Sequence, residues 1–337
     1  MSQLNKFTHK SNFLSKERRF KASHFVGLAI IAAILAIMLP QRYLALVLCF
    51  TCIHAIAVTG LDILFGYTGQ ISFGHAGLYA IGSYGSTLLS IRAGLPVWLS
   101  VLAGALLSAL VGAIIAFPAS RLVKHFLSLL TIAFGQMVFI IISITTKLTN
   151  GFTGISSIPP IRLFGLDFNT PFRFFILAAI LLCLFLVLKA NLIRSRIGRA
   201  FIAIRENTAA ADGMGINVRY YKVLAFALSA FLCGFAGALY AHLMGFISPD
   251  TFNATTSNMF MTELLFGGIA TITGPLVGSF ILVVVTEVLQ SLVRYQMLVY
   301  AAFILLVLFF MPNGVIGLIK KFIDKFKQRR EARHAER

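Results

Sequence analysis

Glu263 is the residue of this sequence whose setting most suggests chemistry. It lies in the segment NMFMTELLFGG, and a carboxylate within an apolar run of this kind is by default a candidate for a functional site. The structural alternative is a carboxylate that hydrogen-bonds a neighbouring helix or reaches an interface. Asp62 and Glu287 fit that alternative better, because each can lie near the end of an apolar segment.

Two glycine-rich segments, 66–77 (GYTGQISFGHAG) and 267–278 (GGIATITGPLVG), combine flexible backbone with polar side chains. Glycine weakens a helix and exposes its backbone, which is tolerated only where the chain faces protein or a water-filled path. The functional interpretation is a pore lining or gate; the alternative is close helix packing through small residues, and both can hold. The candidates for a translocation path are Tyr67, Thr68, Gly69, Gln70, Ser72, His75, Glu263, Gly267 and Gly268.

No pattern of catalytic or metal-binding residues accompanies these segments. The sequence has no Ser/His/Asp motif, no HExxH and no paired carboxylates, and the absence of any Gly-Lys dipeptide excludes a phosphate-binding P-loop. His54, His125 and His242 are isolated, which favours polar contacts over metal binding. Cys49 and Cys52 are predicted to be small apolar residues of a helix. We therefore predict no catalytic residues, no metal and no cofactor.

One long polar stretch, residues 191–222, separates two blocks of apolar sequence. Within it, residues 195–204 have the apolar spacing of a short amphipathic helix. A second helix is predicted over residues 209–214, capped by Asn207 or Thr208 and ended by glycine. Two short helices at a membrane surface form a compact knob. The alternative, an amphipathic helix lying in lipid, suits the basic residues but not the acidic portion 206–212.

Composition indicates the elements that must position these residues. Of 337 residues, 58% are hydrophobic and only 12% are charged, with a mean hydropathy of +0.89. Soluble domains carry about a quarter charged residues, and a run of roughly 20 apolar residues crosses a bilayer. We predict an all-α polytopic membrane protein. The ten expected spans are 24–39, 43–64, 71–91, 96–118, 126–146, 172–188, 223–246, 257–272, 275–292 and 296–311.

The net charge of +18 comes from basic residues that lie mostly near the ends of these spans and in the tails. Most basic residues fall in 6–21, 121–124, 189–222 and 320–337, and short basic connections mark the cytoplasmic side. Ten crossings place both termini and the 191–222 loop there. Anionic lipid then explains the charge better than nucleic acid does. The predicted order is a basic tail (1–23), six spans (24–190), the cytoplasmic loop (191–222), four spans (223–311) and a basic tail (312–337).

Three further predictions concern the spans and the connections between them. Glycine-broken stretches near 66–77 and 267–278 are places where half-helices or re-entrant segments can change the count of crossings. The largest loop on the outer side is 147–171, rich in turn-forming residues, and a loop of this length without helical period is often functional. The first span is expected to be retained rather than cleaved as a signal peptide, because no small-residue cleavage site follows it.

Four segments in order give the chain a family resemblance. GYTGQISFGHAG, the stretch from SRIGRAFIAIRENTAAADGMGINVRYYK to ALYAH, GFISPDTF and GGIATITGPLVGS together resemble the permease subunit of high-affinity branched-chain amino acid importers of the ABC class. The resemblance covers about residues 40–315. It implies a permease similar to those of vitamin B12 importers, without enzymatic activity, in the bacterial inner membrane. It departs at residues 256–261, which are more polar than expected.

The same resemblance implies partners: a second homologous permease, two ATPase subunits, a periplasmic amino-acid-binding protein and membrane lipid, with no nucleic acid. In such permeases a cytoplasmic loop with an Ala-Ala-x-x-x-Gly pattern docks into the ATPase. Here Ala210, Ala211 and Gly215 match it, and Asp212 stands where the family often has Glu. The expected ATPase-coupling residues are Arg205, Glu206, Ala210, Ala211, Asp212, Gly213 and Gly215.

Three other functions remain open at this stage. Permeases for urea or short-chain amides look similar, although the Gly69-Gln70 pair favours the amino-acid branch. A membrane-embedded enzyme, such as a lipid-modifying transferase, requires clustered polar residues at one depth, and those found here are scattered. An ATP-independent channel or carrier does not need the docking-type loop.

Overall fold

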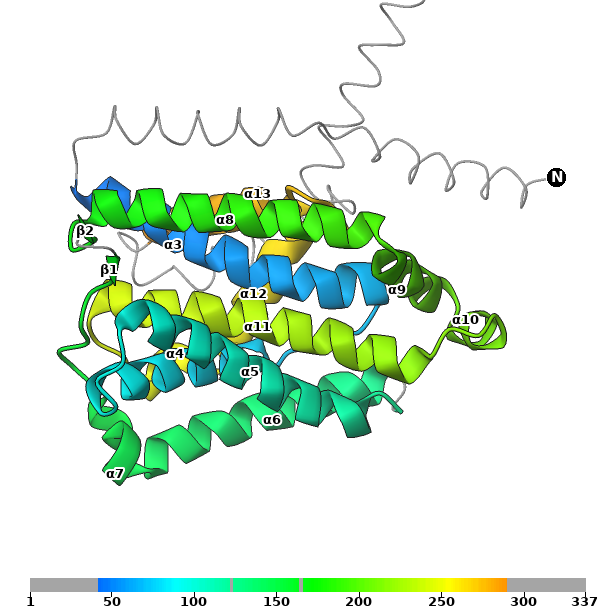
Figure 1. Cartoon of the computed structure of the whole chain (residues 1–337), viewed down its shortest axis with the longest axis horizontal. Coiled ribbons are helices and arrows are strands. Elements are labelled where there is room, and N and C mark those ends of the chain that lie inside the picture. Colours follow the sequence, from blue (N-terminus) through cyan, green and yellow to red (C-terminus); the bar gives the residue numbers. More distant parts are fainter. Residues whose placement is uncertain (1–41, 122–123, 164–165, 290–337) are drawn as a thin grey trace, which may run out of the picture.

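The computed structural model of the protein describes residues 42–121, 124–163 and 166–289 (Figure 1). The predicted spans 24–39 and 296–311 and both basic tails lie outside these residues. The described elements are α3 (Arg42–Leu61), the π-helix η1 (Asp62–Tyr67), α4 (His75–Ile91), α5 (Val97–Ala119), α6 (Lys124–Ile144), α7 (Thr146–Thr149), η2 (Gly151–Thr153), β1 (Arg162–Leu163), β2 (Leu166–Asp167), α8 (Pro171–Arg194), α9 (Arg196–Glu206), α10 (Thr208–Gly213), α11 (Val218–Met244), η3 (Pro249–Phe252), α12 (Ala254–Gly267) and α13 (Gly274–Leu289).

Five of the described helices are long and apolar enough to cross a membrane. They are Tyr43–Tyr67, Val97–Ala119, Phe126–Ile144, Pro171–Arg194 and Val218–Met244. The helices α4, α12 and α13 have 17, 14 and 16 residues. At 1.5 Å per residue, α12 spans only about 21 Å of a hydrocarbon core of about 30 Å. The chain is a multi-pass membrane protein in which full-length and shorter helices are combined.

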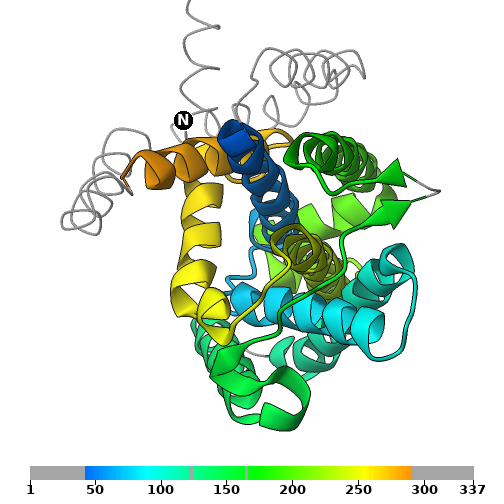
Figure 2. The ribbon, with the colours of Figure 1, turned by 90° about the vertical axis from the view of Figure 1, so that its left-hand side faces the viewer.

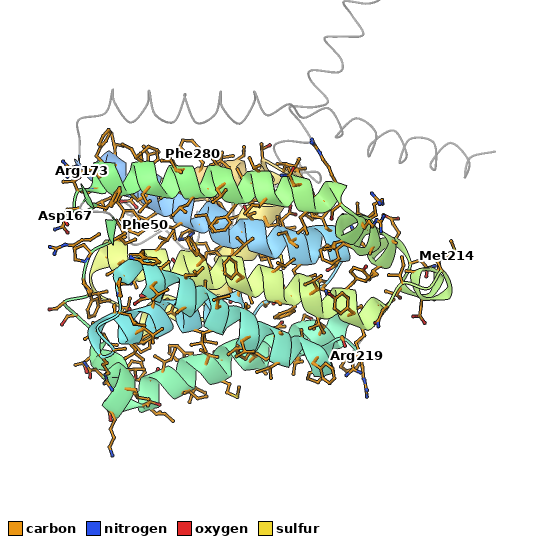
Figure 3. All side chains as sticks on the ribbon, in the orientation of Figure 1. Phe50, Asp167, Arg173, Met214, Arg219 and Phe280 are labelled. Carbon is orange, nitrogen blue, oxygen red and sulfur yellow. The ribbon has the colours of Figure 1, made fainter. Side chains whose placement is uncertain are left out.

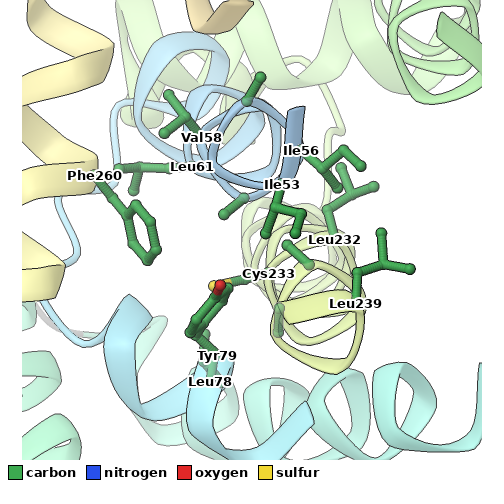
Figure 4. Packing of buried hydrophobic residues seen from close by; sticks show 14 of the residues in the cluster. Ile53, Ile56, Val58, Leu61, Leu78, Tyr79, Leu232, Cys233, Leu239 and Phe260 are labelled. Carbon is green, nitrogen blue, oxygen red and sulfur yellow. The ribbon is translucent and has the colours of Figure 1, made fainter. Parts of the chain in front are cut away.

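The helices α3 and α11 form the centre of the bundle, and α5, α6 and α8 lie outside them. In Figures 1 and 2, α3 and α11 run between α8 on one side and α4, α5 and α6 on the other. Figure 4 shows Ile53, Tyr79 and Leu232 of three different helices meeting in the interior. The outer helices expose large apolar side chains, among them Leu110 of α5 and Leu129 of α6. Such faces are suited to contact with lipid tails, because an apolar side chain there is not exposed to water.

Small residues allow the central helices to approach closely. A Cβ on Gly82 of α4 would overlap the main chain of Gly234 in α11, and a Cβ on Gly112 of α5 would overlap Ala230 of α11. On the other side of α4, Gly77 faces Gly135 of α6. The small-residue packing expected around the first glycine-rich segment is therefore present, as in other membrane bundles.

Both glycine-rich segments interrupt helices. After α3 the chain continues as η1, is non-helical from 69 to 74 and resumes as α4. Between α12 and α13, residues 268–273 form a second non-helical stretch, in which Gly268 and Ala270 have φ of 109° and 57°. We call residues 62–74 the first interruption and residues 268–273 the second interruption. Helix breaks are therefore present at both of the glycine-rich places that the sequence indicates.

The segments that connect the helices lie at the two ends of the bundle. At one end Lys222 Nζ lies 3.4 Å from the Ser120 carbonyl and donates to it, and Gln70 Nε2 donates to the Lys222 carbonyl at 3.2 Å. This end, with α9 and α10, is on the right of Figure 1. The 191–222 loop and the α5–α6 turn, which the charge pattern predicts to share one side, meet at this end, and the first interruption lies beside them.

The opposite end is closed by the 147–171 connection. Instead of an irregular loop, it contains α7, η2 and a hairpin of the two-residue strands β1 and β2. Ile155 pairs with Ile247 in an antiparallel bridge, and His242 Nδ1 donates to the Pro159 carbonyl at 2.7 Å. The connection is thereby fixed onto the C-terminal end of α11.

Candidate functional site

Two short helices, α9 and α10, form the knob expected within the 191–222 loop; we define the knob as residues 195–217. The Ser195 hydroxyl accepts from the Ile197 amide at 3.2 Å and begins α9. The Asn207 side chain accepts from the amides of Ala209 and Ala210 at 3.0 Å each and begins α10. Side-chain acceptors at these positions satisfy amides that lack intrahelical partners. Both predicted helices are confirmed, with Asn207 as the cap of the second.

One face of α9 anchors the knob to the bundle. Phe201 and Ile204 are fully buried, and the Phe201 ring meets Tyr221 of α11 edge-on with 6.2 Å between centroids. The opposite face carries exposed arginines, including Arg196 and Arg199. This arrangement makes α9 a rigid extension of the bundle rather than a loose loop.

The tip of the knob has few contacts with the rest of the chain. Met214 is 84% exposed and lies at the outermost point of the knob in Figure 3. A Cβ added to Gly213 or Gly215 would meet no atom within 4 Å, and Gly215 has φ of 80°. Of the two matching alanines, Ala211 is buried while Ala210 is exposed. An exposed apolar tip on a capped helix is a surface suited to a protein partner.

An open groove of ≈ 690 Å³ runs between α10 and the first turns of α11. Asp212 lies on its α10 side, and Arg219 and Lys222 lie on its α11 side. The Arg219 guanidinium stacks on the Phe117 ring of α5 at 3.7 Å, which holds the α11 wall in place. The groove therefore presents both signs of charge beside the knob.

Beneath the knob is a buried ion pair that links three elements. Asp62 is 0% and Lys189 1% exposed; Lys189 Nζ donates to Asp62 Oδ2 at 2.6 Å and to the Thr271 carbonyl at 3.0 Å. Asp62 Oδ1 accepts from the Ala270 amide at 2.7 Å. We call these four residues the Asp62 junction. It joins the first interruption, the second interruption and the end of α8.

The position of Lys189 corrects an inference from the charge pattern. Its neighbours in sequence place it in the basic cluster of the cytoplasmic side, yet its side chain turns inward to Asp62. The physical reason is that Asp62 is buried and needs a compensating cation. Glu287 behaves as expected for a residue near an interface, because it accepts a hydrogen bond from the Tyr43 hydroxyl at an exposed position.

Arg205 connects the knob with the first interruption. Its Nη1 donates to the Gly66 carbonyl, and its Cγ would lie 3.4 Å from a Cβ on Gly69. A Cβ on Gly66 would overlap the Asp62 carboxylate and the Ala270 amide. The absence of a side chain at Gly66 is what lets Asp62 reach the Ala270 amide, whereas a Cβ on Gly69 would make only an ordinary contact with Arg205. The guanidinium of Arg205 thus hydrogen-bonds within the chain, although Arg205 and Glu206 are both exposed residues at the end of α9.

Glu263 forms a second buried polar group further along the bundle. It is 0% exposed, and Ser279 Oγ donates to its Oε2 at 2.6 Å while His54 Nδ1 donates to Oε1 at 2.8 Å. We call these three residues the Glu263 junction. The polar contact predicted for His54 is confirmed, and His242 likewise lies 2.8 Å from Ser86 Oγ through its Nε2. The His125 side chain lies outside the described residues.

The remaining path candidates do not form one continuous surface. Tyr67 lies beside the Asp62 junction, with Lys189 Nζ 5.7 Å from its ring centroid. Gln70 Nε2 donates to Thr68 Oγ1 at 3.0 Å, and Gly69 lies beside the knob. The two nitrogens of His75 lie 3.0 Å from Ser72 Oγ and 2.7 Å from Ser229 Oγ of α11. Apart from Gly69, which is partly buried, all of these residues are buried.

The second interruption uses its glycines for close packing. A Cβ on Gly267 would overlap the Gly274 carbonyl, and one on Gly278 would overlap the Glu263 carbonyl. The main chains of α12 and α13 are therefore in close contact. The unexpected polarity of residues 256–261 has a local cause. Ser257 Oγ accepts from the Ala76 amide at 2.8 Å and so satisfies the beginning of α4.

Sequence reasoning missed a row of hydroxyl groups on α4. Tyr79, Ser83, Tyr84 and Thr87 are buried, and their hydroxyl oxygens have no hydrogen-bond partner within the described part of the chain. The spacing of Tyr79, Ser83 and Thr87 at intervals of four residues in an apolar span was the available signal. Within that same part of the chain, no three His, Cys, Asp or Glu side chains are grouped so that they could hold a metal ion.

Comparison with known proteins gives a consistent result. The family described as branched-chain amino acid transport system, permease component, matches residues 43–310. The high-affinity branched-chain amino acid transport system permease protein LivM of Escherichia coli K12 is 31% identical over 293 residues, covering 80% of this chain and 69% of the relative. The permease protein LivH of Salmonella typhimurium is 30% identical over 293 residues, covering 78% and 91%. The BraD protein of Pseudomonas aeruginosa is 27% identical over 283 residues. No solved structure matches.

Proposed function

The chain belongs to the family of permease components of branched-chain amino acid transport systems, and we propose that it is the membrane-spanning permease subunit of an ATP-driven importer. Its cargo is branched-chain amino acids, as the names of its relatives state for those proteins. The transporter lies in the bacterial inner membrane, with ten spans and both termini in the cytoplasm. The chain performs no chemistry on its cargo.

The knob is the observation that carries this proposal. A permease without a phosphate-binding loop must receive its energy from another chain, and the knob is a capped, projecting structure with an exposed apolar tip. One ATPase subunit binds the knob of this chain, and a second binds that of a homologous permease. Glu206, Ala210, Asp212 and Gly213 lie exposed on the knob and form part of the contact. The mixed charges of the adjacent groove complement a polar protein surface.

The partner arrangement assigns the two ends of the bundle to different tasks. The end with the knob faces the cytoplasm and the ATPases. The opposite end, closed by the 147–171 connection, faces the periplasmic amino-acid-binding protein, which delivers the cargo. ATP binding draws the ATPases together, and the knobs transmit that movement to the helices. The helices then switch the cargo path from one side of the membrane to the other. Because the path candidates are buried within the chain, this movement must open a route past them.

Uptake by the assembled transporter tests the proposal. The chain is co-expressed with the second permease and the two ATPases of the same importer, reconstituted into vesicles and supplied with the binding protein. We expect uptake of labelled leucine, isoleucine or valine that requires ATP. Uptake without ATP would indicate a channel or carrier, and uptake of labelled urea or short amides in place of leucine would indicate the related amide importers; either result would overturn the assignment.

A pair of matched glycine variants tests the role of the knob. Gly215→Trp and Gly94→Trp both place a large side chain at a positive φ, with no atom within 4 Å of the new Cβ. Gly215 is on the knob and Gly94 is at the opposite end. We expect Gly215→Trp to abolish co-purification of the ATPase and ATP-dependent uptake, while Gly94→Trp retains ATPase binding. Equal ATPase binding by both variants would show that the ATPase docks elsewhere.

A further inference from the structure

We infer that Arg205 and the Asp62–Lys189 pair form a mechanical link that makes both helix interruptions follow the movement of the knob. The inference rests on the proposed function, because it assigns to these three residues the step from ATPase movement to the membrane interior. Arg205, Asp62 and Lys189 are positioning residues in this scheme: they hold main-chain segments and do not contact the cargo.

The first part of the link runs from α9 to the first interruption. Arg205 is at the end of α9, one residue beyond the fully buried Ile204. Its guanidinium donates to the Gly66 carbonyl within the π-helix η1. A π-helix is rare and is frequently found at functional sites. A displacement of α9 therefore acts directly on this irregular turn.

The second part runs from the first interruption to the second. One oxygen of Asp62 accepts from the Ala270 amide at 2.7 Å, and the other accepts from Lys189, which also donates to the Thr271 carbonyl at 3.0 Å. Both groups held in the second interruption are main-chain groups. Ala270 has a left-handed φ of 57°, which is strained for a residue with a Cβ and persists only when its surroundings enforce it. Asp62 and Lys189 supply that enforcement.

A second route connects the knob with the interruptions through α8. Lys189 lies in α8, and after Arg194 at the end of that helix the chain turns at Ser195 directly into α9. The knob thus contacts the interruptions by two routes: through Arg205 and Gly66, and through α8 and Lys189. An ion pair without access to water is costly to separate, so Asp62 and Lys189 are expected to move together throughout the cycle. The hydrogen bonds of the Glu263 junction join α3, α12 and α13, so this junction lies outside the link.

The experiment measures amino acid transported per ATP hydrolysed in the reconstituted complex. Arg205→Met removes the hydrogen bond to Gly66, and Arg205→Lys keeps a donor of similar length. Arg121→Met removes an exposed arginine from the α5–α6 turn at the same end of the bundle and is the control. For Arg205→Met we expect the transport ratio to fall by about tenfold, within the usual range of coupling between sites. ATP hydrolysis stays near the wild-type rate, and Arg205→Lys restores most of the ratio.

A buried variant separates the link from ATPase docking. Gly66→Ala cannot touch the ATPase, yet its Cβ displaces the Asp62 carboxylate and the Ala270 amide. We expect it to lower the transport ratio as Arg205→Met does, with the ATPase still bound. If Arg205→Met instead loses the ATPase on co-purification, Arg205 is a docking residue and the link is wrong. An unchanged ratio in Arg205→Met also overturns it, whether or not Gly66→Ala folds. Failure of wild-type uptake would refute the proposed function instead.

Discussion

The two buried carboxylates in the described part of the chain, Asp62 and Glu263, perform different structural tasks. Asp62 pairs with a lysine and, with it, holds main-chain groups of the second interruption. Glu263 binds side chains, the histidine of α3 and the serine of α13. The Asp62 junction therefore determines where a non-helical backbone runs, whereas the Glu263 junction holds three helices side by side.

This difference determines how well each junction tolerates substitution. A side chain that loses its partner can rotate or accept another hydrogen bond, but the Ala270 amide and the Thr271 carbonyl cannot leave a buried turn. The Asp62 junction also contains two full charges, whose separation in the interior is expensive. We therefore expect substitutions at the Asp62 junction to have larger effects than matched substitutions at the Glu263 junction.

Loss of the buried lysine should have the largest effect. Lys189→Met leaves the Asp62 carboxylate buried without its cation, which is expected to lower the free energy of unfolding by about 3–5 kcal/mol. Thermal unfolding in detergent measures the change. Lys147→Met, at an exposed position on the opposite end, is the control and should shift stability by less than about 0.5 kcal/mol. A loss below about 1 kcal/mol for Lys189→Met would mean that the ion pair does not hold the interruptions.

A glycine pair gives the second-largest contrast. Gly66→Ala introduces a Cβ that overlaps Asp62 and Ala270, and overpacking of this kind typically lowers stability by about 1–3 kcal/mol. Gly213→Ala, at the end of α10, meets no atom within 4 Å and should be close to neutral. Unfolding measurements on the two variants give the comparison directly. Equal stability of both variants would show that the first interruption can relax around a new methyl group.

The contrast between the two carboxylates explains what sequence could and could not predict. Local features were readable: the glycine clusters predicted both interruptions, and Asn207 before a run of alanines predicted the beginning of α10. The burial of Glu263 followed from its apolar neighbours. Its partner did not, because His54 is separated from it by 209 positions and nothing in either local sequence indicates the other.

Asp62 and Lys189 show the same limit more strongly. Each lies near the end of an apolar run, where an ionisable residue can face water or a neighbouring helix, and local sequence does not decide between the two. Only the three-dimensional arrangement, in which α8 passes beside η1, brings Lys189 Nζ within 2.6 Å of the Asp62 carboxylate. The hydrogen bond from Arg205 to Gly66 was hidden for a related reason, because the sequence of a surface helix does not show which residues reach a particular main-chain group of the bundle.

A serine pair tests the smaller effect expected at the Glu263 junction. Ser279→Ala removes the hydroxyl that donates to Glu263 Oε2 and should lower stability by about 1.5 kcal/mol, the scale of a hydrogen bond to a charged group. Ser83→Ala removes a buried hydroxyl that has no partner among the described residues, so it should be neutral or stabilising. The unfolding midpoints of the two variants measure the two stability changes. A larger loss for Ser83→Ala would reveal a partner for the α4 hydroxyls and a polar interior there.

The smallest effect on overall stability is expected at the knob, which belongs to neither junction. Asn207→Ala removes the cap of α10 and is worth about 1 kcal/mol locally, so hydrogen exchange of the Ala209 and Ala210 amides should quicken by about fivefold. Because α10 projects from the bundle, its fraying leaves the unfolding midpoint unchanged. Asn207→Asp retains a side-chain acceptor and should restore slow exchange. If Asn207→Ala lowered the midpoint as much as Ser279→Ala, the knob would be part of the folded core, and its movement could not be separated from that of the bundle.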